Sequence, residues 1–458
     1  MINNIRHQLK SLHDETVQFQ KRPLKQITMK LALLLRDYRH DQSETLLAQI
    51  KFAQAAIQDI HQQQKERQED TALQTHITKA ERCSKYHLRP PTTPLLRKSP
   101  FKDIQTPTGE IVTSQVEISN TLSDYYTALY DQSEPLIDSD VEQYLKPLIK
   151  NKLSPTQKLF LAAPILAREF YDAIQHTKND STPGPNSLPY EILKLFPSNW
   201  AKAFELLFQY QLHSHPNLTP GQLTSLLVLL YKKSDRHLPQ NYRPISLLNI
   251  DVKILTMVLA HRTQNVIQSI IHPDQQGFIR GRSIQTNLLR LEDLQHFMRQ
   301  KSRQSVVALL DFEKAFDRVN HKCLLTVLRC FDFPQTFIKA ISNIYSKRKG
   351  RLIVNGHLSK PFAINRGVLQ GDPLSPLLFV IALEPMCIDI RRHPAYGIST
   401  GTHTHTGSYY ADDSQLYARD VPALRRQMEL LNPFVKYLDS NLTLPKRNSS
   451  HTPHYQPI

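Results

Sequence analysis

Short apolar runs that end in charged residues dominate the second half of the chain. The run SVVALLD, residues 305–311, predicts a buried strand that presents Asp311 at its tip. The run GSYYADDSQLYAR, residues 407–419, has apolar and aromatic residues on both sides of two adjacent acids, which predicts a β-hairpin with carboxylates at its turn. The run LTSLLVLLY, residues 223–231, predicts another buried strand, and NYRPISLLN, residues 241–249, is expected to pair with it as a two-stranded flap.

Helical periodicity marks the beginning of the chain. Residues 24–80 contain neither Gly nor Pro, and apolar residues within them recur at alternating steps of four and three. Such a stripe covers one face of a helix, and two heptads are too few to favour a coiled coil. We therefore expect a helix that packs within its own domain. The stripe consists of Leu46, Ile50, Ala53, Ile57 and Ile60.

Local turn and capping signals locate further elements. Thr108 with Gly109, and Asn355 with Gly356, are each typical of a hairpin turn. The segment from Ser114 to Glu117 has the pattern of a capping box, which opens a helix. The other predicted helices are an amphipathic one directly after Asp311 over residues 312–328, an apolar one within residues 367–385 and one over residues 422–438.

Proline-containing segments interrupt the periodic ones. Residues 89–100, RPPTTPLLRKSP, indicate a linker or an extended basic strap. Residues 179–196 contain a Pro-Gly-Pro turn before a short helix. Next to Asn186 and Ser187 this turn can hold a strand of nucleic acid, but the chemistry favours a rigid connector. Residues 446–458 are polar, contain Pro and are expected to be disordered.

The charge of the chain narrows the class of partner. Its 458 residues are enough for about two or three domains. Lys and Arg number 57 and Asp and Glu 41, which gives a net charge of +16. This excess favours a polyanionic partner, with nucleic acid the first candidate, over a basic surface that only keeps the protein soluble.

The cysteines and the first residues set further limits. No two cysteines form a Cys-x-x-Cys pair, which argues against a zinc site and a disulfide framework and suits a reducing compartment. The chain does not start like a signal peptide, and apolar runs such as residues 377–383 are too short to cross a bilayer. We expect an intracellular protein, soluble or ribonucleoprotein-bound, in the nucleus or the cytoplasm and without a membrane partner. The cysteines are Cys83, Cys323, Cys330 and Cys387.

Three acids are the strongest candidates for chemistry. Asp412 and Asp413 repel each other, so they need a cation, a partner charge or water. An isolated Tyr-Ala-Asp-Asp is more often a solvated turn. Asp311 changes this balance because its strand can bring a third carboxylate to the same edge. Three acids on adjoining strand ends can hold two magnesium ions, the arrangement used to join a nucleotide to a primer.

Basic residues near the flap and in two loops are candidates for phosphate contacts. Lys232 and Arg243 are expected to lie near each other and can grip a triphosphate, with two solvated charges as the alternative. Arg280 and Arg282 flank Gly281 in a loop that suits a phosphate backbone, or in a solvated one. A second basic cluster, also a candidate for binding nucleic acid, consists of Lys347, Arg348 and Lys349.

Uncharged candidates lie near the acids in the sequence. Phe316, five residues beyond Asp311, is close enough to overhang a bound nucleotide, although an isolated Phe is more often a core residue. Gln370 and Gly371 open the loop before the apolar helix. There they can meet a base pair or a sugar without steric conflict.

Several segments resemble, in order, the motifs of reverse transcriptases. LDFEKAFDRV, GVLQGDPLSP and YADD resemble motifs A, B and C of that family. NYRPISLLN and QQGFIRGRSI are similar to the finger motifs of its non-LTR (LINE-type) branch. TPGPNSLPYEILK resembles the extra N-terminal motif of that branch, and residues 101–130 resemble the segment before it. The resemblance covers roughly residues 80–440, and the ordered set is specific because independent weak motifs multiply.

The resemblance implies an α+β, right-hand polymerase with fingers and palm, a helical N-terminal extension and a missing thumb. The implied activity is RNA-directed DNA polymerisation, with an RNA template, a DNA primer and deoxynucleoside triphosphates as partners. The implied cofactors are two Mg²⁺ ions, for which Mn²⁺ can substitute; an oligomeric state is not implied. The implied roles are catalysis and metal binding for Asp311, Asp412 and Asp413, triphosphate binding for Lys232 and Arg243, exclusion of a 2′-hydroxyl for Phe316, and a nucleotide-pocket loop for Gln370 and Gly371.

Some positions depart from the family pattern. Leu369 stands where many relatives have Arg, and Asn186 and Ser187 replace an Asp-Gly pair. An ungapped match puts Asn448 where relatives have a Lys thought to donate a proton, a role that Lys446 can take. An alternative interpretation is an inactive, truncated retroelement fragment that keeps the fold and binds nucleic acid.

The motifs also suggest how the chain divides into domains. We expect a helical N-terminal region over residues 1–88 and an N-terminal extension of the polymerase over residues 89–215. Fingers and palm are expected over residues 216–445, followed by the tail over residues 446–458.

Overall fold

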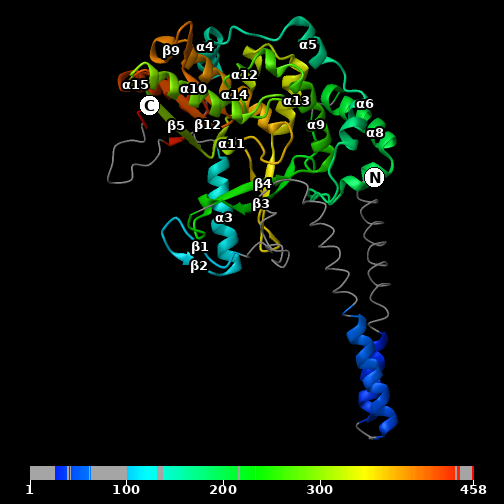
Figure 1. Cartoon of the computed structure of the whole chain (residues 1–458). Helices are drawn as coiled ribbons and strands as arrows, with labels where there is room; N and C mark the ends of the chain where they lie inside the picture. Colours follow the sequence, from blue (N-terminus) through cyan, green and yellow to red (C-terminus); the bar gives the residue numbers. More distant parts are fainter. Residues whose placement is uncertain are drawn as a thin grey trace. The chain divides into compact units, whose positions relative to one another are not determined.

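The protein divides into two compact units, residues 1–100 and 101–458. Figure 1 shows the computed structural model of the chain. Residues 101–215 of the expected extension and the expected polymerase segment both fall within the second unit, whereas residues 89–100 of the extension fall within the first. The structure describes residues 26–38, 41, 43–60, 62, 101–131, 138–214, 217–232, 234–438, 441–443 and 456–457.

The described residues of the first unit form two helices, over residues 26–38 and 44–60. Ile50 and Ala53 of the predicted apolar stripe are buried, so the stripe is the inner face of the second helix, as expected. The expected linker over residues 89–100 lies outside the described residues.

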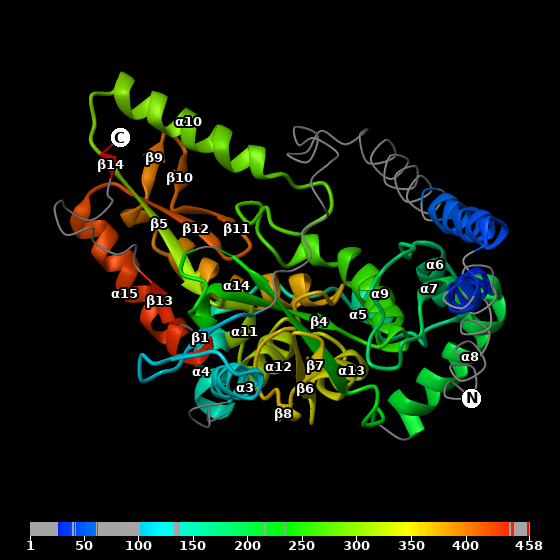
Figure 2. The same cartoon turned by 90° about the horizontal axis from the view of Figure 1, so that it is seen from below.

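One sheet of the second unit is entirely antiparallel. Its strands follow the order β11 (Gly407–Tyr410), β12 (Asp413–Ala418), β5 (Val306–Glu313) and β13 (Asn441–Thr443). A two-residue strand, β14 (Gln456–Pro457), also pairs with β5; the rest of the tail that we expected to be disordered lies outside the described residues. Figure 2 shows β11, β12 and β5 side by side. The predicted acidic hairpin and the predicted strand that ends near Asp311 are therefore confirmed.

A second sheet contains the predicted flap. Here β3 (Thr224–Tyr231) pairs with β4 (Tyr242–Leu247) in the antiparallel sense, as expected. On its other side β3 pairs in parallel with β6 (Lys349–Val354), which also pairs with β7 (His357–Leu358) and β8 (Phe362–Ala363). The parallel pair joins segments more than a hundred residues apart, and no local pattern predicted it.

The turn at Thr108 and Gly109 is confirmed, and of the predicted capping box the N-cap at Ser114 is confirmed. Thr108 and Gly109 lie in the turn between β1 (Ile104–Gln105) and β2 (Ile111–Val112). Ser114 caps α3 (Gln115–Tyr130), because its hydroxyl accepts a hydrogen bond from the backbone N–H of Glu117 at 3.2 Å.

The second predicted hairpin turn is also present. Asn355 and Gly356 connect β6 to β7 with φ angles of 51° and 85°. Such positive angles suit these two residue types and the twist of a tight hairpin.

The helix expected directly after Asp311 is broken in two. Strand β5 continues to Glu313, and a short helix α11 (Ala315–Arg318) follows it. The longer helix α12 (His321–Cys330) begins only after Asn320, whose side chain accepts a hydrogen bond from the N–H of Cys323 at 3.0 Å. The single continuous helix was therefore a wrong prediction, because Asn320 acts as a new N-cap.

Helices surround both sheets, and the apolar helix α14 (Ser375–Arg391) is central among them. Residues 377–383 of α14 are all buried, as predicted. The other longer helices of this unit are α4 (Asp138–Leu148), α5 (Pro155–Ala162), α6 (Ala167–Gln175), α7 (Tyr190–Leu195), α8 (Pro197–Gln209), α9 (Ile250–Gln264), α10 (Ile284–Gln300), α13 (Gln335–Tyr345) and α15 (Val421–Leu438).

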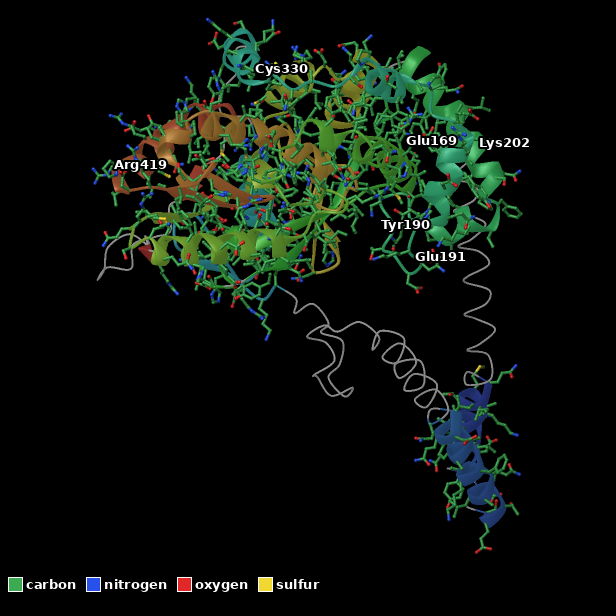
Figure 3. The ribbon with its side chains drawn as sticks, turned by 45° about the horizontal axis from the view of Figure 1, so that its top comes forward. Glu169, Tyr190, Glu191, Lys202, Cys330 and Arg419 are labelled. Carbon is green, nitrogen blue, oxygen red and sulfur yellow. The ribbon has the colours of Figure 1, made fainter. Side chains whose placement is uncertain are left out.

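An ion pair between a buried arginine and a half-buried glutamate joins the helices on one side of this unit. The guanidinium of Arg262, on α9, donates to both carboxylate oxygens of Glu169, on α6, at 2.7 Å. Figure 3 shows Glu169 near Tyr190 and Glu191 on this side, far from Arg419 beyond the end of β12.

The Pro-Gly-Pro turn packs directly on the backbone that follows β4. A Cβ atom added to Gly184 would lie 2.3 Å from the carbonyl carbon of Leu248, so only glycine fits. The N–H of Asn186 donates to the side-chain oxygen of Asn249 at 2.9 Å. These contacts favour the rigid connector over the nucleic-acid support.

Among the described residues, no helix is both long enough and apolar enough to span a membrane.

Candidate active site

The three predicted acids meet at one end of the antiparallel sheet. Ser414 of β12 is paired with Leu310 of β5, so the next step of this register sets Asp413 opposite Asp311. Side chains opposite each other on neighbouring strands have Cβ atoms about 4.5–5.5 Å apart. Asp412 lies in the two-residue turn before β12, next to Ala411.

The electrostatics agree with this proximity. Burial raises the pKa of the Asp412 carboxyl, and the charges of Asp413 and Asp311 raise it further, whereas Arg243 acts in the opposite direction. The Asp412 carboxyl is therefore close enough to both other acids to feel their charges, and a cation between them would lower the free energy of the cluster.

The donor set fits a divalent metal ion such as Mg²⁺, because carboxylate oxygens are the ligands that Mg²⁺ prefers in proteins. Among the residues that the structure describes, no group of three or more His, Cys, Asp or Glu side chains is arranged so that it could hold a metal ion. The three acids therefore supply suitable ligand atoms, but their side chains do not form a complete coordination site.

Lys232 and Arg243 lie near each other, as predicted. Arg243 pairs with Leu230 across the flap, and the N–H of Lys232 donates to the carbonyl of Asn241 at 2.9 Å. Because side chains alternate along a strand, Lys232 lies on the same face as Leu230 and Arg243. Both cations are exposed, and Arg243 is close enough to Asp412 for its charge to lower the pKa of that carboxyl.

Gln370 is held by a buried carboxyl that sequence reasoning missed. Its amide donates to both oxygens of Asp317 at 3.1 Å, and the hydroxyl of Tyr130 donates to the same carboxyl at 3.1 Å. Asp317 is 2% exposed, and burial raises its pKa to about 6 against the charge of Lys314. Its partners lie 53 and 187 residues away, so no local signal identifies it.

The loop that contains Gln370 docks on the flap. The carbonyl of Gln370 accepts a hydrogen bond from the N–H of Ser246, on β4, at 2.7 Å. Gly371 has φ +101°, and an added Cβ atom would lie 3.0 Å from the carbonyl oxygen of Ser246. Gly371 therefore allows two backbone segments to approach closely, and its role is not limited to leaving room for a ligand.

Phe316 lies in a row of three aromatic rings. Its ring stacks on Phe379, with centroids 4.4 Å apart, and meets the edge of Phe278 at 6.3 Å. Phe379 is buried, Phe316 is half-buried and Phe278 is 44% exposed. One face of Phe316 is thus a core contact, and its predicted contact with a sugar stays a prediction.

The basic cluster before β6 is only partly on the surface. Lys347 and Lys349 are exposed, but Arg348 is 1% exposed and its Nε donates to the carbonyl of Ile344 at 2.9 Å. The prediction that Arg348 contacts nucleic acid is therefore wrong. Lys347 has a left-handed φ of 54°, which changes the direction of the backbone after α13. Arg348 is therefore buried in the protein, and burial lowers the pKa of its guanidinium to about 10.

The two arginines around Gly281 also differ in their surroundings. Arg280 is exposed, whereas Arg282 donates to the backbone carbonyls of Ile271, His272 and Gln275 at 2.7–2.8 Å. Arg282 therefore supports the loop, and its contact with phosphate stays a prediction.

Comparison with known proteins agrees with this geometry. The family "Reverse transcriptase (RNA-dependent DNA polymerase)" matches residues 231–453. The Transposon TX1 uncharacterized 149 kDa protein of Xenopus laevis is 32% identical over 278 residues, which cover 60% of this chain and 21% of that protein. The retrovirus-related Pol polyprotein from type-2 retrotransposable element R2DM of Drosophila melanogaster is 27% identical over 267 residues, 58% of this chain and 24% of that protein.

A third relative extends the comparison to another mobile element. The RNA-directed DNA polymerase from mobile element jockey of Drosophila funebris is 27% identical over 238 residues, 51% of this chain and 26% of that protein. The chain thus spans between 21% and 26% of the length of these three relatives. Residues 231–453 thus match the reverse transcriptase family, in agreement with the resemblance of the sequence to its non-LTR branch.

Proposed function

We propose that this chain catalyses RNA-directed DNA polymerisation, extending a DNA primer on an RNA template with deoxynucleoside triphosphates. The observation that carries the proposal is the register of β12 on β5, which sets Asp413 opposite Asp311 beside Asp412 in the adjoining turn. This is a carboxylate cluster suited to transfer of a nucleotidyl group.

Asp311, Asp412 and Asp413 would hold two divalent cations, Mg²⁺ or in its place Mn²⁺. Such ions, when bound, activate the primer hydroxyl and stabilise the leaving pyrophosphate. The three carboxylates fix where charge is concentrated, and two of them are presented by paired strands, which makes the site rigid.

Residues around the acids would bind the nucleotide. The exposed Lys232 and Arg243 of the flap would face the acids and would draw the triphosphate toward them. Phe316 would restrict the sugar at C2′, and Gln370 and Gly371 would line the pocket from the loop docked on β4.

The template and primer would lie on exposed basic residues. Arg280, Lys347 and Lys349 are available for phosphate contacts, and the net charge of +16 favours them. In the right-hand description, the antiparallel sheet with the acids is the palm and the flap with its sheet belongs to the fingers.

Primer extension on an RNA template tests the proposal. Asp412→Ala should abolish extension but leave RNA affinity nearly unchanged, because affinity resides in the basic surface. Asp124→Ala, which removes an exposed acid on α3, is the matched control and should extend at the parental rate.

Two outcomes would contradict the proposal. Extension by Asp412→Ala at the parental rate would exclude the acids as the catalytic centre. A parental chain that binds RNA but adds no nucleotide would support the alternative, a retroelement fragment that binds nucleic acid without polymerising.

A further inference from the structure

The segment over residues 274–277 runs beside β11 as if it were one more strand. The N–H of Tyr409 donates to the carbonyl of Asp274 at 2.9 Å, and the N–H of Gln276 donates to the carbonyl of Tyr409 at 2.8 Å. Gln275 and Tyr409 form a parallel bridge. The segment is thus fixed to the strand that leads into the acidic turn.

The side chain of Gln275 reaches the acidic turn itself. Its oxygen Oε1 accepts hydrogen bonds from the backbone N–H of Ala411 at 2.9 Å and from that of Gly277 at 2.8 Å. Gln275 is 1% exposed, so water does not compete for these bonds. One buried amide oxygen therefore connects the loop to the residue directly before Asp412.

The acidic turn needs such an external support. Ala411 has φ 55°, a left-handed conformation that is unfavourable for a non-glycine residue. Gly277 permits the contact, because an added Cβ atom would lie 2.4 Å from the nitrogen of Ala411. A second bond fixes the approach to the turn, since the side-chain amide of Asn287, on α10, donates to the carbonyl of Tyr409 at 2.9 Å.

We propose that Gln275 is a positioning residue for the metal-binding carboxylates. By holding the backbone of Ala411, its amide oxygen sets where Asp412 and Asp413 stand relative to Asp311. Gln275 does not touch the nucleotide or the metals; it acts through the turn. The catalytic role of Gln275 in this inference rests on the proposed polymerase function. The hydrogen bond from Ala411 to Gln275 is observed independently of that function.

Three variants separate this role from a general contribution to the fold. Gln275→Met keeps the size of the side chain and removes the acceptor, and Gln275→Glu restores an acceptor oxygen. Gln276→Met is the matched control. Gln276 is also buried, but its side chain bonds Pro273 and Ser283 and makes no bond to the turn.

The first measurement is hydrogen exchange at the Ala411 amide in the full chain, which requires neither activity nor metal. Loss of the acceptor in Gln275→Met should speed exchange about 10-fold or more, since a buried hydrogen bond is removed. Gln276→Met and Gln275→Glu should exchange like the parent. Equal exchange in Gln275→Met and the parent would overturn the inference.

The second measurement is Mn²⁺ binding, followed by electron paramagnetic resonance. Residues that orient metal ligands typically affect metal affinity about 10- to 100-fold, so Gln275→Met should weaken Mn²⁺ binding within that range. Gln276→Met should not, and RNA affinity should stay unchanged in both. A merely structural role would lower the unfolding midpoint of both variants and move Mn²⁺ affinity in neither, which would also overturn the inference.

The same titration keeps the two proposals apart. If the parent binds Mn²⁺ no better than Asp412→Ala, the proposed function fails, while the exchange rate of Ala411 still decides whether Gln275 holds the turn. If the parent binds Mn²⁺ through Asp412 and Gln275→Met binds it equally well, only the inference on Gln275 fails.

Discussion

Asp317 and Arg348 are charged side chains that lie almost entirely inside the protein, with exposed fractions of 2% and 1%. Burial shifts both pKa values toward the uncharged form, to about 6 for the carboxyl and to about 10 for the guanidinium. The residues next to them in the sequence do not indicate that these two side chains are buried. Arg348 stands in a run of basic residues that is typical of a surface, and Asp317 depends on Tyr130 and Gln370, which are distant in the sequence.

The raised pKa of Asp317 predicts a pH dependence of stability. Its folded-state pKa of about 6 lies above the ordinary value, so the folded state retains a proton that the unfolded chain releases. The associated stability is complete below about pH 4 and is lost as the pH rises through about 6, an effect on the order of 3 kcal/mol.

Asp317→Asn should remove this dependence, because the amide does not titrate and its oxygen can still accept from Tyr130. We expect a flatter free energy of unfolding between about pH 4 and pH 7, measured with urea. Asp124→Asn, an exposed acid, is the control and should keep the parental slope. An unchanged slope in Asp317→Asn would show that another group is responsible.

At the scale of elements, the sequence predicted those features that depend on neighbouring residues. The hairpin at Asn355 and Gly356 and the cap at Ser114 are local, and both are confirmed. The acidic hairpin is local too, and its pairing with β5 agrees with the proposal that the three acids adjoin. The parallel pair of β3 and β6 and the contact of Gln275 with Ala411 depend on segments far apart, which one sequence does not reveal.

The packing of the Pro-Gly-Pro turn gives a test at this scale. Gly184→Ala would bring a methyl group within 2.3 Å of the backbone at Leu248, which cannot yield as a flexible side chain can. We expect a loss of about 1–3 kcal/mol in the free energy of unfolding, typical of an overpacked site.

Gly221→Ala is the matched control for this substitution. The nearest atom to its added Cβ is 4.0 Å away, so it should leave the urea midpoint unchanged or raise it slightly. If Gly184→Ala unfolds at the same urea concentration as Gly221→Ala, the turn is less rigidly seated than its contacts indicate.

At the scale of the whole molecule, the net charge of +16 predicts how RNA binding responds to salt. Contacts between cationic side chains and phosphates release counterions, so six or more contacts should cost about 10³-fold in affinity between roughly 50 and 200 mM salt. Filter binding or fluorescence anisotropy at several salt concentrations gives the slope. Lys347→Ala should reduce it by about one, and a nearly flat dependence in the parent would refute a broad electrostatic footprint.

The parallel pairing of β3 with β6 limits how the flap can move relative to the acids. A hairpin joined to the protein only at its base could swing alone, but β3 is bonded along one edge to β4 and along the other to β6. The backbone that carries Lys232 and Arg243 can therefore approach or leave the acids only if the neighbouring strands move with it. The bond between Ser246 and Gln370 would transmit that movement to the loop before α14, so grip on the triphosphate and access to the pocket would change in one mechanical step.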